Sequence, residues 1–119
     1  MGDLSFQKWQ VYKDALDHIE ESAALFKTIP KGNGEVIDQL KRAGISIATN
    51  ISEGAGKFDR LDKRRYYRSA GGSAFECVGI LDIMLRLGVI SDLDHQRMTE
   101  RLKSISRGLV GLQKGAMNR

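Results

Sequence analysis

The chain has 119 residues, with 19 Lys or Arg against 15 Asp or Glu, and its formal net charge is +4. A chain of this length forms one domain and can bury roughly two-thirds of the surface that its unfolded form exposes. Its single cysteine, Cys77, excludes an intrachain disulfide or a Cys/His zinc cluster, and no apolar run could cross a membrane, so we expect a cytoplasmic protein without a metal or other cofactor.

Four segments carry apolar residues three and four positions apart, which predicts helices at about 5–28, 33–54, 60–87 and 91–114. The first is predicted to bury Trp9, Tyr12, Leu16, Ile19, Ala23 and Phe26. Gly54 is predicted to end the second helix as a left-handed cap, and Gly88 to end the third. Asp59 is predicted as the N-cap of the third helix, and Ser91, followed by Asp94, as that of the fourth.

Long helices joined by short loops run antiparallel to their neighbours, so residues 1–119 are predicted to form one all-α, up-down four-helix bundle. The second half of the third helix, 77–87, is apolar around nearly its whole circumference. A helix in a small bundle buries only a stripe, so this segment predicts a second partner surface, which self-association would supply.

A polar row lies beside the core face of the second helix. Arg42, Ser46, Asn50 and Glu53 fall together about 120° from the isoleucines of that face, and the third helix has a comparable flank that includes Gly72 and Glu76, with Ser73 beside it. Such a row is typical of a hydrogen-bonded contact between helices or between subunits.

A catalytic or di-metal site would pair Glu53 with Glu76, but a di-metal bundle also needs a Glu-x-x-His on each of two further helices. The nearest approach is Asp92-x-x-His95, so we predict neither a metal site nor an enzyme. His18 and His95 are expected at the surface or at an interface, and Cys77 in the core. The EGAGK at 53–57 also fails as a phosphate loop, because no Ser or Thr follows its lysine and a helix precedes it.

All of the excess positive charge lies in residues 57–68, where six basic residues face two acidic ones. The candidate phosphate contacts are Lys57, Arg60, Lys63, Arg64, Arg65 and Arg68, with Tyr66 or Tyr67 as a stacking surface. A basic run is usually only a solvated face. Cations at the start of a helix oppose its macrodipole, however, which favours a role other than helix stability.

The stretches QLKRAGISIATNISEGAGK (39–57) and YYRSAGGSAFE (66–76) resemble the paired signature of the four-helix bundle proteins named for intervening sequences of 23S ribosomal RNA genes. The matching positions are Gln39, Arg42, Ser46, Asn50, Glu53, Gly54, Ala70, Gly72, Ser73 and Glu76. The resemblance implies a homopentameric ring. It also implies kinship with accessory proteins of diversity-generating retroelements, which bind nucleic acid and a reverse transcriptase.

Two functions follow as hypotheses. The first is a non-enzymatic oligomer that binds RNA or DNA through residues 57–68. The second is a structural or adaptor ring that uses the same basic segment to bind an acidic partner protein, with no nucleic-acid role.

Overall fold

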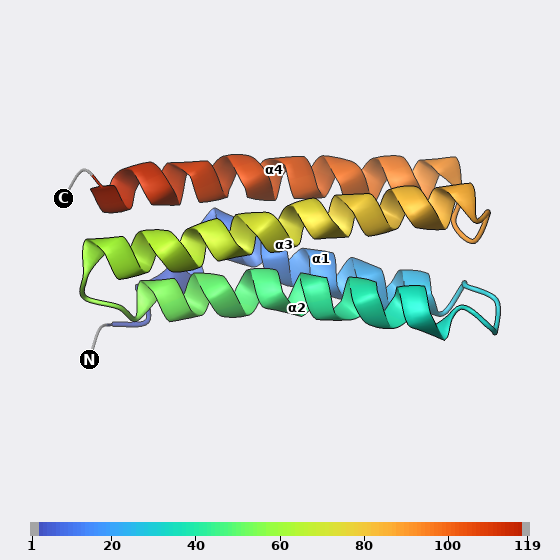
Figure 1. Ribbon diagram of the computed structural model, residues 1–119, viewed down its shortest axis with the longest axis horizontal. Helices are drawn as coiled ribbons and strands as arrows, with labels where there is room; N and C mark the ends of the chain where they lie inside the picture. Colours follow the sequence, from blue (N-terminus) through green and yellow to red (C-terminus); the bar gives the residue numbers. More distant parts are fainter. Residues whose placement is uncertain (1–2, 118–119) are drawn as a thin grey trace.

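Four helices run back and forth along one long axis and are joined by short turns (Figure 1). The computed structural model describes residues 3–117, and no strand occurs within that range. The helices are α1 (Gln10–Phe26), α2 (Gly34–Ala55), α3 (Arg60–Arg86) and α4 (Asp92–Met117), preceded by a 3₁₀ helix, η1 (Ser5–Lys8). The fold is therefore all-α, as predicted, and the molecule extends 46 × 22 × 21 Å.

The first predicted helix differs from the structure in two respects. Trp9 adopts an extended conformation (ψ 134°) and separates η1 from α1, so no single helix covers 5–28. The buried face is also a different row, formed by Val11, Ala15, His18, Ser22 and Leu25, whereas Leu16 of the predicted row is 43% exposed. The apolar pattern predicted the wrong row because two members of the buried row, His18 and Ser22, are polar. A neighbouring row of larger apolar residues fitted the helical period equally well.

Local capping signals mark both ends of α3 and the start of α4 as predicted, whereas α4 continues to Met117, three residues past its predicted end. The Asp59 carboxylate accepts a hydrogen bond from the Leu61 N–H at 2.9 Å, and the Ser91 hydroxyl accepts one from the Asp94 N–H at 3.1 Å. Gly88 has a φ of +72°, the left-handed conformation in which glycine ends a helix without a Cβ penalty.

The prediction that Gly54 is a left-handed cap was wrong. Gly54 is buried inside α2, which continues to Ala55 and ends before Gly56, whose φ of −82° is ordinary for any residue. A Cβ added to Gly54 would lie 2.6 Å from Cε1 of Tyr67. Glycine is needed here because the Tyr67 ring of α3 lies against the α2 backbone.

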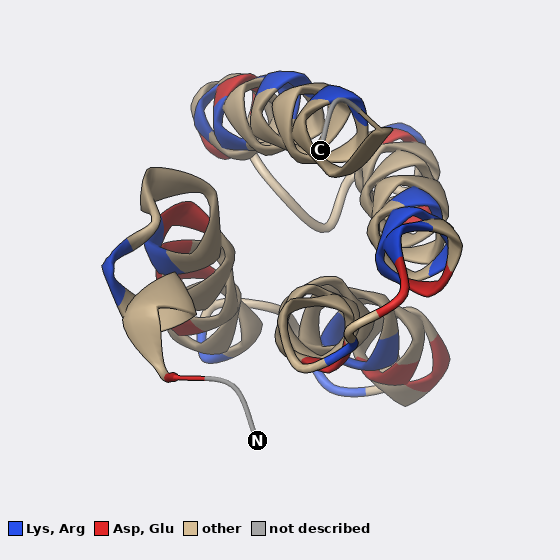
Figure 2. Cartoon of the chain, turned by 90° about the vertical axis from the view of Figure 1, so that its left-hand side faces the viewer, with Lys and Arg blue, Asp and Glu red and all other residues tan. Residues whose placement is uncertain are grey.

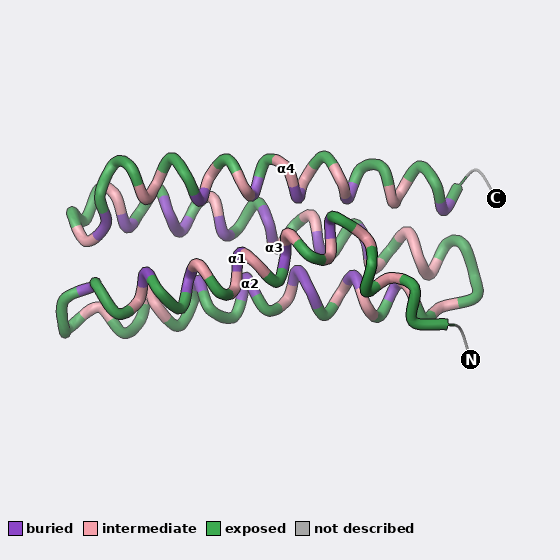
Figure 3. Tube along the Cα trace, turned by 180° about the vertical axis from the view of Figure 1, so that it is seen from behind, coloured by how far each residue is buried: buried purple, intermediate pink, exposed green. Residues whose placement is uncertain are grey.

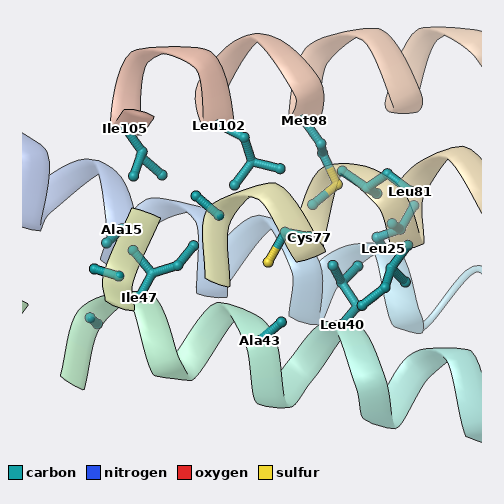
Figure 4. Close-up of a cluster of buried hydrophobic side chains, with 14 of the residues drawn as sticks. Ala15, Leu25, Leu40, Ala43, Ile47, Cys77, Leu81, Met98, Leu102 and Ile105 are labelled. Atoms are coloured by element: carbon teal, nitrogen blue, oxygen red, sulfur yellow. The ribbon is translucent and has the colours of Figure 1, made fainter. Parts of the chain in front are cut away.

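The core runs along the inward sides of all four helices, and their outward sides are exposed (Figure 3). Leu40 and Ile47 of α2, Leu81 of α3 and Leu102 of α4 are fully buried and point toward one another (Figure 4). Cys77 is also fully buried, and burial raises the pKa of its thiol to about 12, which confirms a packing role. No helix within residues 3–117 combines the length and hydropathy needed to span a bilayer.

His18 was expected at the surface or an interface, and this prediction was wrong. Its side chain is fully buried in α1 and lies against α2 at Gly44, where an added Cβ would meet the ring at 3.0 Å. Its Nε2 lies 3.4 Å from the Ser22 hydroxyl, while Nδ1 is buried without a hydrogen-bond partner in residues 3–117. Burial lowers the pKa of His18 to about 4, so the ring is neutral at physiological pH.

Candidate nucleic-acid interface

The six candidate basic residues gather at the end of the bundle where α2 connects to α3, and Figure 2 views the molecule from this end. Lys57 lies in the connecting turn, and the other five occupy the first turns of α3. Asp59 and Asp62 are the acidic residues of the same segment. The structure therefore keeps the charge excess in one place, but it gives the six side chains different surroundings.

Lys63 is engaged within the bundle. Its Nζ donates hydrogen bonds to the carbonyl oxygens of Gly54, at 3.3 Å, and Ala55, at 3.1 Å. These carbonyls belong to the last turn of α2, where the helix has unsatisfied acceptors and the negative end of its dipole. Lys63 thus caps α2, and the stability of the α2–α3 junction accounts for this cation.

Lys57 and Arg65 flank the ring of Tyr66. The Lys57 ammonium lies 5.3 Å from the ring centroid and 3.9 Å from the Glu53 carboxylate. The Arg65 guanidinium lies 5.7 Å from the same centroid and donates a hydrogen bond to Asp62 at 3.0 Å. These contacts are partly or largely exposed, so each contributes about 1 kcal/mol or less.

Arg60, Arg64 and Arg68 form what we call the arginine row. They stand four residues apart on α3 and fall within an arc of about 80° at 100° per residue. Arg60 and Arg68 are exposed and Arg64 is partly exposed. None of the three forms an ion pair or hydrogen bond with another of the described residues, 3–117. The row presents three charges without a counter-ion from this part of the chain.

The two tyrosines have different roles. Tyr66 is partly exposed, so it stays a candidate stacking surface. Tyr67 is only 3% exposed, and its ring lies edge-on to Trp9 with 6.4 Å between the ring centroids. Burial of Tyr67 between Trp9 and Gly54 contradicts its prediction as an exposed stacking surface.

A solvent-open pocket of about 710 Å³ lies at the same end of the bundle and is called here the end pocket. Its lining comes from the segment 3–9, the turn between α2 and α3, the start of α3 and the end of α4. Three of the six basic residues, Lys57, Arg60 and Lys63, contribute to it. The sequence does not predict this pocket, because its walls are distant in the sequence and meet only in the folded bundle.

The predicted polar row is only partly brought together. The Ser73 hydroxyl of α3 donates to the Ser46 hydroxyl of α2 at 2.8 Å, and the Asn50 Nδ2 donates to the same hydroxyl at 3.0 Å and to the Ser46 carbonyl at 2.8 Å. This network joins two helices of one chain. The exposed members of the motif stay outside it: Gln39, Arg42, Glu53, Gly72 and Glu76. Among residues 3–117, no group of three or more His, Cys, Asp or Glu side chains could hold a metal ion.

Arg101 joins α4 to α1 through a charge cluster that was not predicted from the sequence. Its guanidinium donates to both carboxylate oxygens of Glu21, at 2.7 and 3.1 Å, and lies 3.5 Å from Asp14 and 3.6 Å from Asp17. The hydrogen bond to Glu21 raises the pKa of Arg101. The three acids are spaced three and four residues apart on one face of α1, and neighbouring like charges on a helix are destabilising. This spacing could therefore have predicted a cation from another helix between them.

The family model described as 23S rRNA-intervening sequence protein matches residues 7–111. The chain belongs to this family. A solved member of the S23 ribosomal protein family, a protein of unknown function from Bacteroides thetaiotaomicron, superposes with a TM-score of 0.81 at 22% identity. The match covers 87% of this chain and 95% of the other, which supports the shared fold. None of the curated proteins compared with the chain matches it.

Membership of the 23S rRNA-intervening sequence protein family confirms the resemblance found in residues 39–57 and 66–76. Neither the family description nor the structural match points to catalysis.

Proposed function

We propose that this 23S rRNA-intervening sequence family protein binds nucleic acid through the arginine row and the neighbouring Lys57 and Arg65. The observation that carries the proposal is the absence of any partner for Arg60, Arg64 and Arg68 among residues 3–117. Arg60 lies in the first turn of α3, where a cation is unfavourable by roughly 0.3 to 1 kcal/mol. An external polyanion would offset this cost and provide the missing counter-charge.

The geometry of the row suits a phosphate backbone. Arg60 and Arg68 are eight residues apart, which is a rise of about 12 Å along the helix. Along a duplex axis this distance includes about seven phosphate charges, and guanidinium groups donate to phosphate in a bidentate manner. The contacts would be to phosphates rather than base edges, so we expect little sequence preference.

We also propose that the chain assembles into the homopentameric ring that the resemblance implies. The support is an exposed apolar surface on α3 and its C-cap residue, where Phe75 is 74% exposed, Ile83 50% and the C-cap Leu87 57%. Large apolar side chains left exposed along one helix are typical of an interaction surface. Five copies of the arginine row in one ring would bind a polyanion more tightly than one copy does.

Titration of labelled RNA and DNA at several salt concentrations tests the binding. With five contacts per chain to a duplex, log K should fall against log salt with a slope of about −4 to −5. The double variant Arg64→Ala/Arg68→Ala should bind more weakly, with the slope reduced in magnitude by about 2. Lys31→Ala/Lys41→Ala removes two exposed cations elsewhere on the bundle and should bind as the unmodified protein does.

Binding that is unchanged in Arg64→Ala/Arg68→Ala would contradict the proposed role of the arginine row. Absence of any RNA or DNA binding at low salt, with the assembly intact, would favour the second hypothesis, an adaptor ring for a reverse transcriptase or another protein with an acidic surface. Light scattering tests the assembly itself. Ile83→Glu should dissociate it and Leu16→Glu on α1 should not, whereas a monomeric mass for the unmodified protein would contradict the ring.

A further inference from the structure

The end pocket has the dimensions of a small-molecule site. Its volume of about 710 Å³ lies within the range of about 300 to 1,000 Å³ that such sites occupy. The arginine row begins at its edge, because Arg60 belongs both to the row and to the pocket lining. The pocket therefore lies where a bound strand would pass.

Cations and aromatic rings both line the end pocket. The turn and the start of α3 contribute the cations Lys57 and Arg60, together with Lys63, whose ammonium is already bound to the α2 carbonyls. Asp3 is the one carboxylate on the lining among residues 3–117, and its Oδ1 accepts a hydrogen bond from the Ser5 N–H at 3.0 Å. The lining thus carries an excess of positive charge.

Aromatic rings form the other part of the lining. Phe58, in the turn, is 83% exposed and therefore presents its ring to solvent at the pocket. Trp9 is partly buried, with its ring edge-on to Phe6 and to Tyr67 at centroid distances of 6.4 Å. The pocket accordingly offers apolar ring surface beside cations.

Helix α4 borders the pocket with two glycines one turn apart, Gly111 and Gly115. A Cβ added to either one would meet no atom within 4 Å, so the protein itself does not require glycine at these positions. Glycine in a helix interior is less favourable than alanine. The effect of both glycines is to keep the pocket open on the α4 side.

We infer that the end pocket binds a single nucleotide, with the base against Phe58 and Trp9 and the phosphate on Lys57 and Arg60. The pairing of a planar apolar surface with adjacent cations matches the two halves of a nucleotide, which neither inorganic phosphate nor a nucleoside would satisfy alone. The nucleotide is either free or the unpaired end of a strand. Binding of a strand end rests on the proposed function, whereas binding of a free nucleotide does not.

Trp9 is the only tryptophan of the chain, so its fluorescence reports on the pocket directly. Titration with AMP and UMP should change this fluorescence saturably, with an affinity about tenfold or more above that of adenosine or inorganic phosphate. Gly115 lines the pocket and a Cβ added there would meet no atom within 4 Å, so Gly115→Leu should fill part of the pocket and weaken nucleotide binding by about tenfold or more. Gly34 begins α2 at the opposite end of the bundle and an added Cβ there likewise meets no atom within 4 Å, so Gly34→Leu should leave nucleotide binding unchanged.

A duplex with a single-stranded overhang, compared with a blunt duplex, separates the two sources. If a strand end occupies the pocket, the overhang should bind more tightly and Gly115→Leu should remove that preference, while blunt-duplex binding through Arg64 and Arg68 persists. If only mononucleotides respond and Gly115→Leu abolishes the response, the pocket binds free nucleotides, even where duplex binding fails. If Gly115→Leu changes neither nucleotide binding nor overhang binding, the inference about the end pocket is overturned. The proposed role of the arginine row would still stand.

Discussion

Replacing Gly54 with alanine tests how α3 packs on α2. The new Cβ would lie 2.6 Å from Cε1 and 2.9 Å from Cδ1 of Tyr67, and 3.1 Å from Cβ of Tyr66. Distances below 3.0 Å are far inside van der Waals contact, so an atom has to move. The Tyr67 ring is buried against Trp9, and it cannot swing aside as an exposed lysine would.

Two opposing terms set the magnitude. Alanine is favoured over glycine in a helix by about 1 kcal/mol, while overpacking a filled core costs about 1 to 3 kcal/mol and forces backbone shifts. The contact here is with a rigid ring and lies at the severe end of that range, so we expect Gly54→Ala to lower the free energy of unfolding by about 1 to 2 kcal/mol. Gly72→Ala on α3 is the matched control, because its Cβ meets nothing within 4 Å and it should stabilise the protein by about 0.5 to 1 kcal/mol.

Urea denaturation followed by far-ultraviolet circular dichroism, at one protein concentration for all variants, measures both changes. A truncated ring should relieve the contact, so Gly54→Ala should destabilise Tyr67→Leu less than it destabilises the unmodified protein. If Gly54→Ala proves as stable as Gly72→Ala, the Tyr67 ring is not fixed against α2 and the explanation for Gly54 is refuted.

Three further predictions concern stability. The folded-state pKa of His18, about 4, lies below its ordinary value of 6.5, so its contribution to the free energy of unfolding is complete above pH 6.5 and falls by about 3 kcal/mol toward pH 4. In urea denaturation at several pH values, His18→Leu should remove this loss of stability at acid pH. The control variant His95→Gln should still show the loss. Arg101→Met leaves three neighbouring carboxylates unpaired at a partly exposed site and should cost about 1 to 2 kcal/mol, against about 0.5 or less for the exposed Arg97→Met. Ser73→Ala removes the hydrogen bond between α2 and α3 and should cost about 1 kcal/mol in the same assay.

The helices could be predicted from the sequence because their signals are local. Asp59 and Ser91 bond to N–H groups two and three residues away, and Gly88 ends α3 through its own backbone angle. Two of the errors arose where a distant contact decides the outcome. Gly54 is required by Tyr67 of the next helix, and His18 is buried because Gly44 of α2 leaves room for its ring.

In the candidate site too, local features could be predicted from the sequence and contacts between helices could not. The basic segment could be located from charge alone, and its net excess lies where the sequence placed it. Three other features could not be predicted, because each depends on how the helices meet. They are the bonding of Lys63 to α2, the salt bridge from Arg101 to Glu21 eighty residues away, and the end pocket.

Helix dipoles distinguish the cations of residues 57–68 from one another. At the α2–α3 junction the negative end of α2 and the positive end of α3 come close together, and a cation is stabilised only at the first. Lys63 bonds to that end through two carbonyls, and Asp59 caps the other, as helix stability alone would favour. Arg60 adds positive charge to the first turn of α3, and none of Arg60, Arg64 and Arg68 has a carboxylate partner within residues 3–117. Folding of the single chain therefore explains Lys63 but not the arginine row, and the row is where an anionic partner would contribute most.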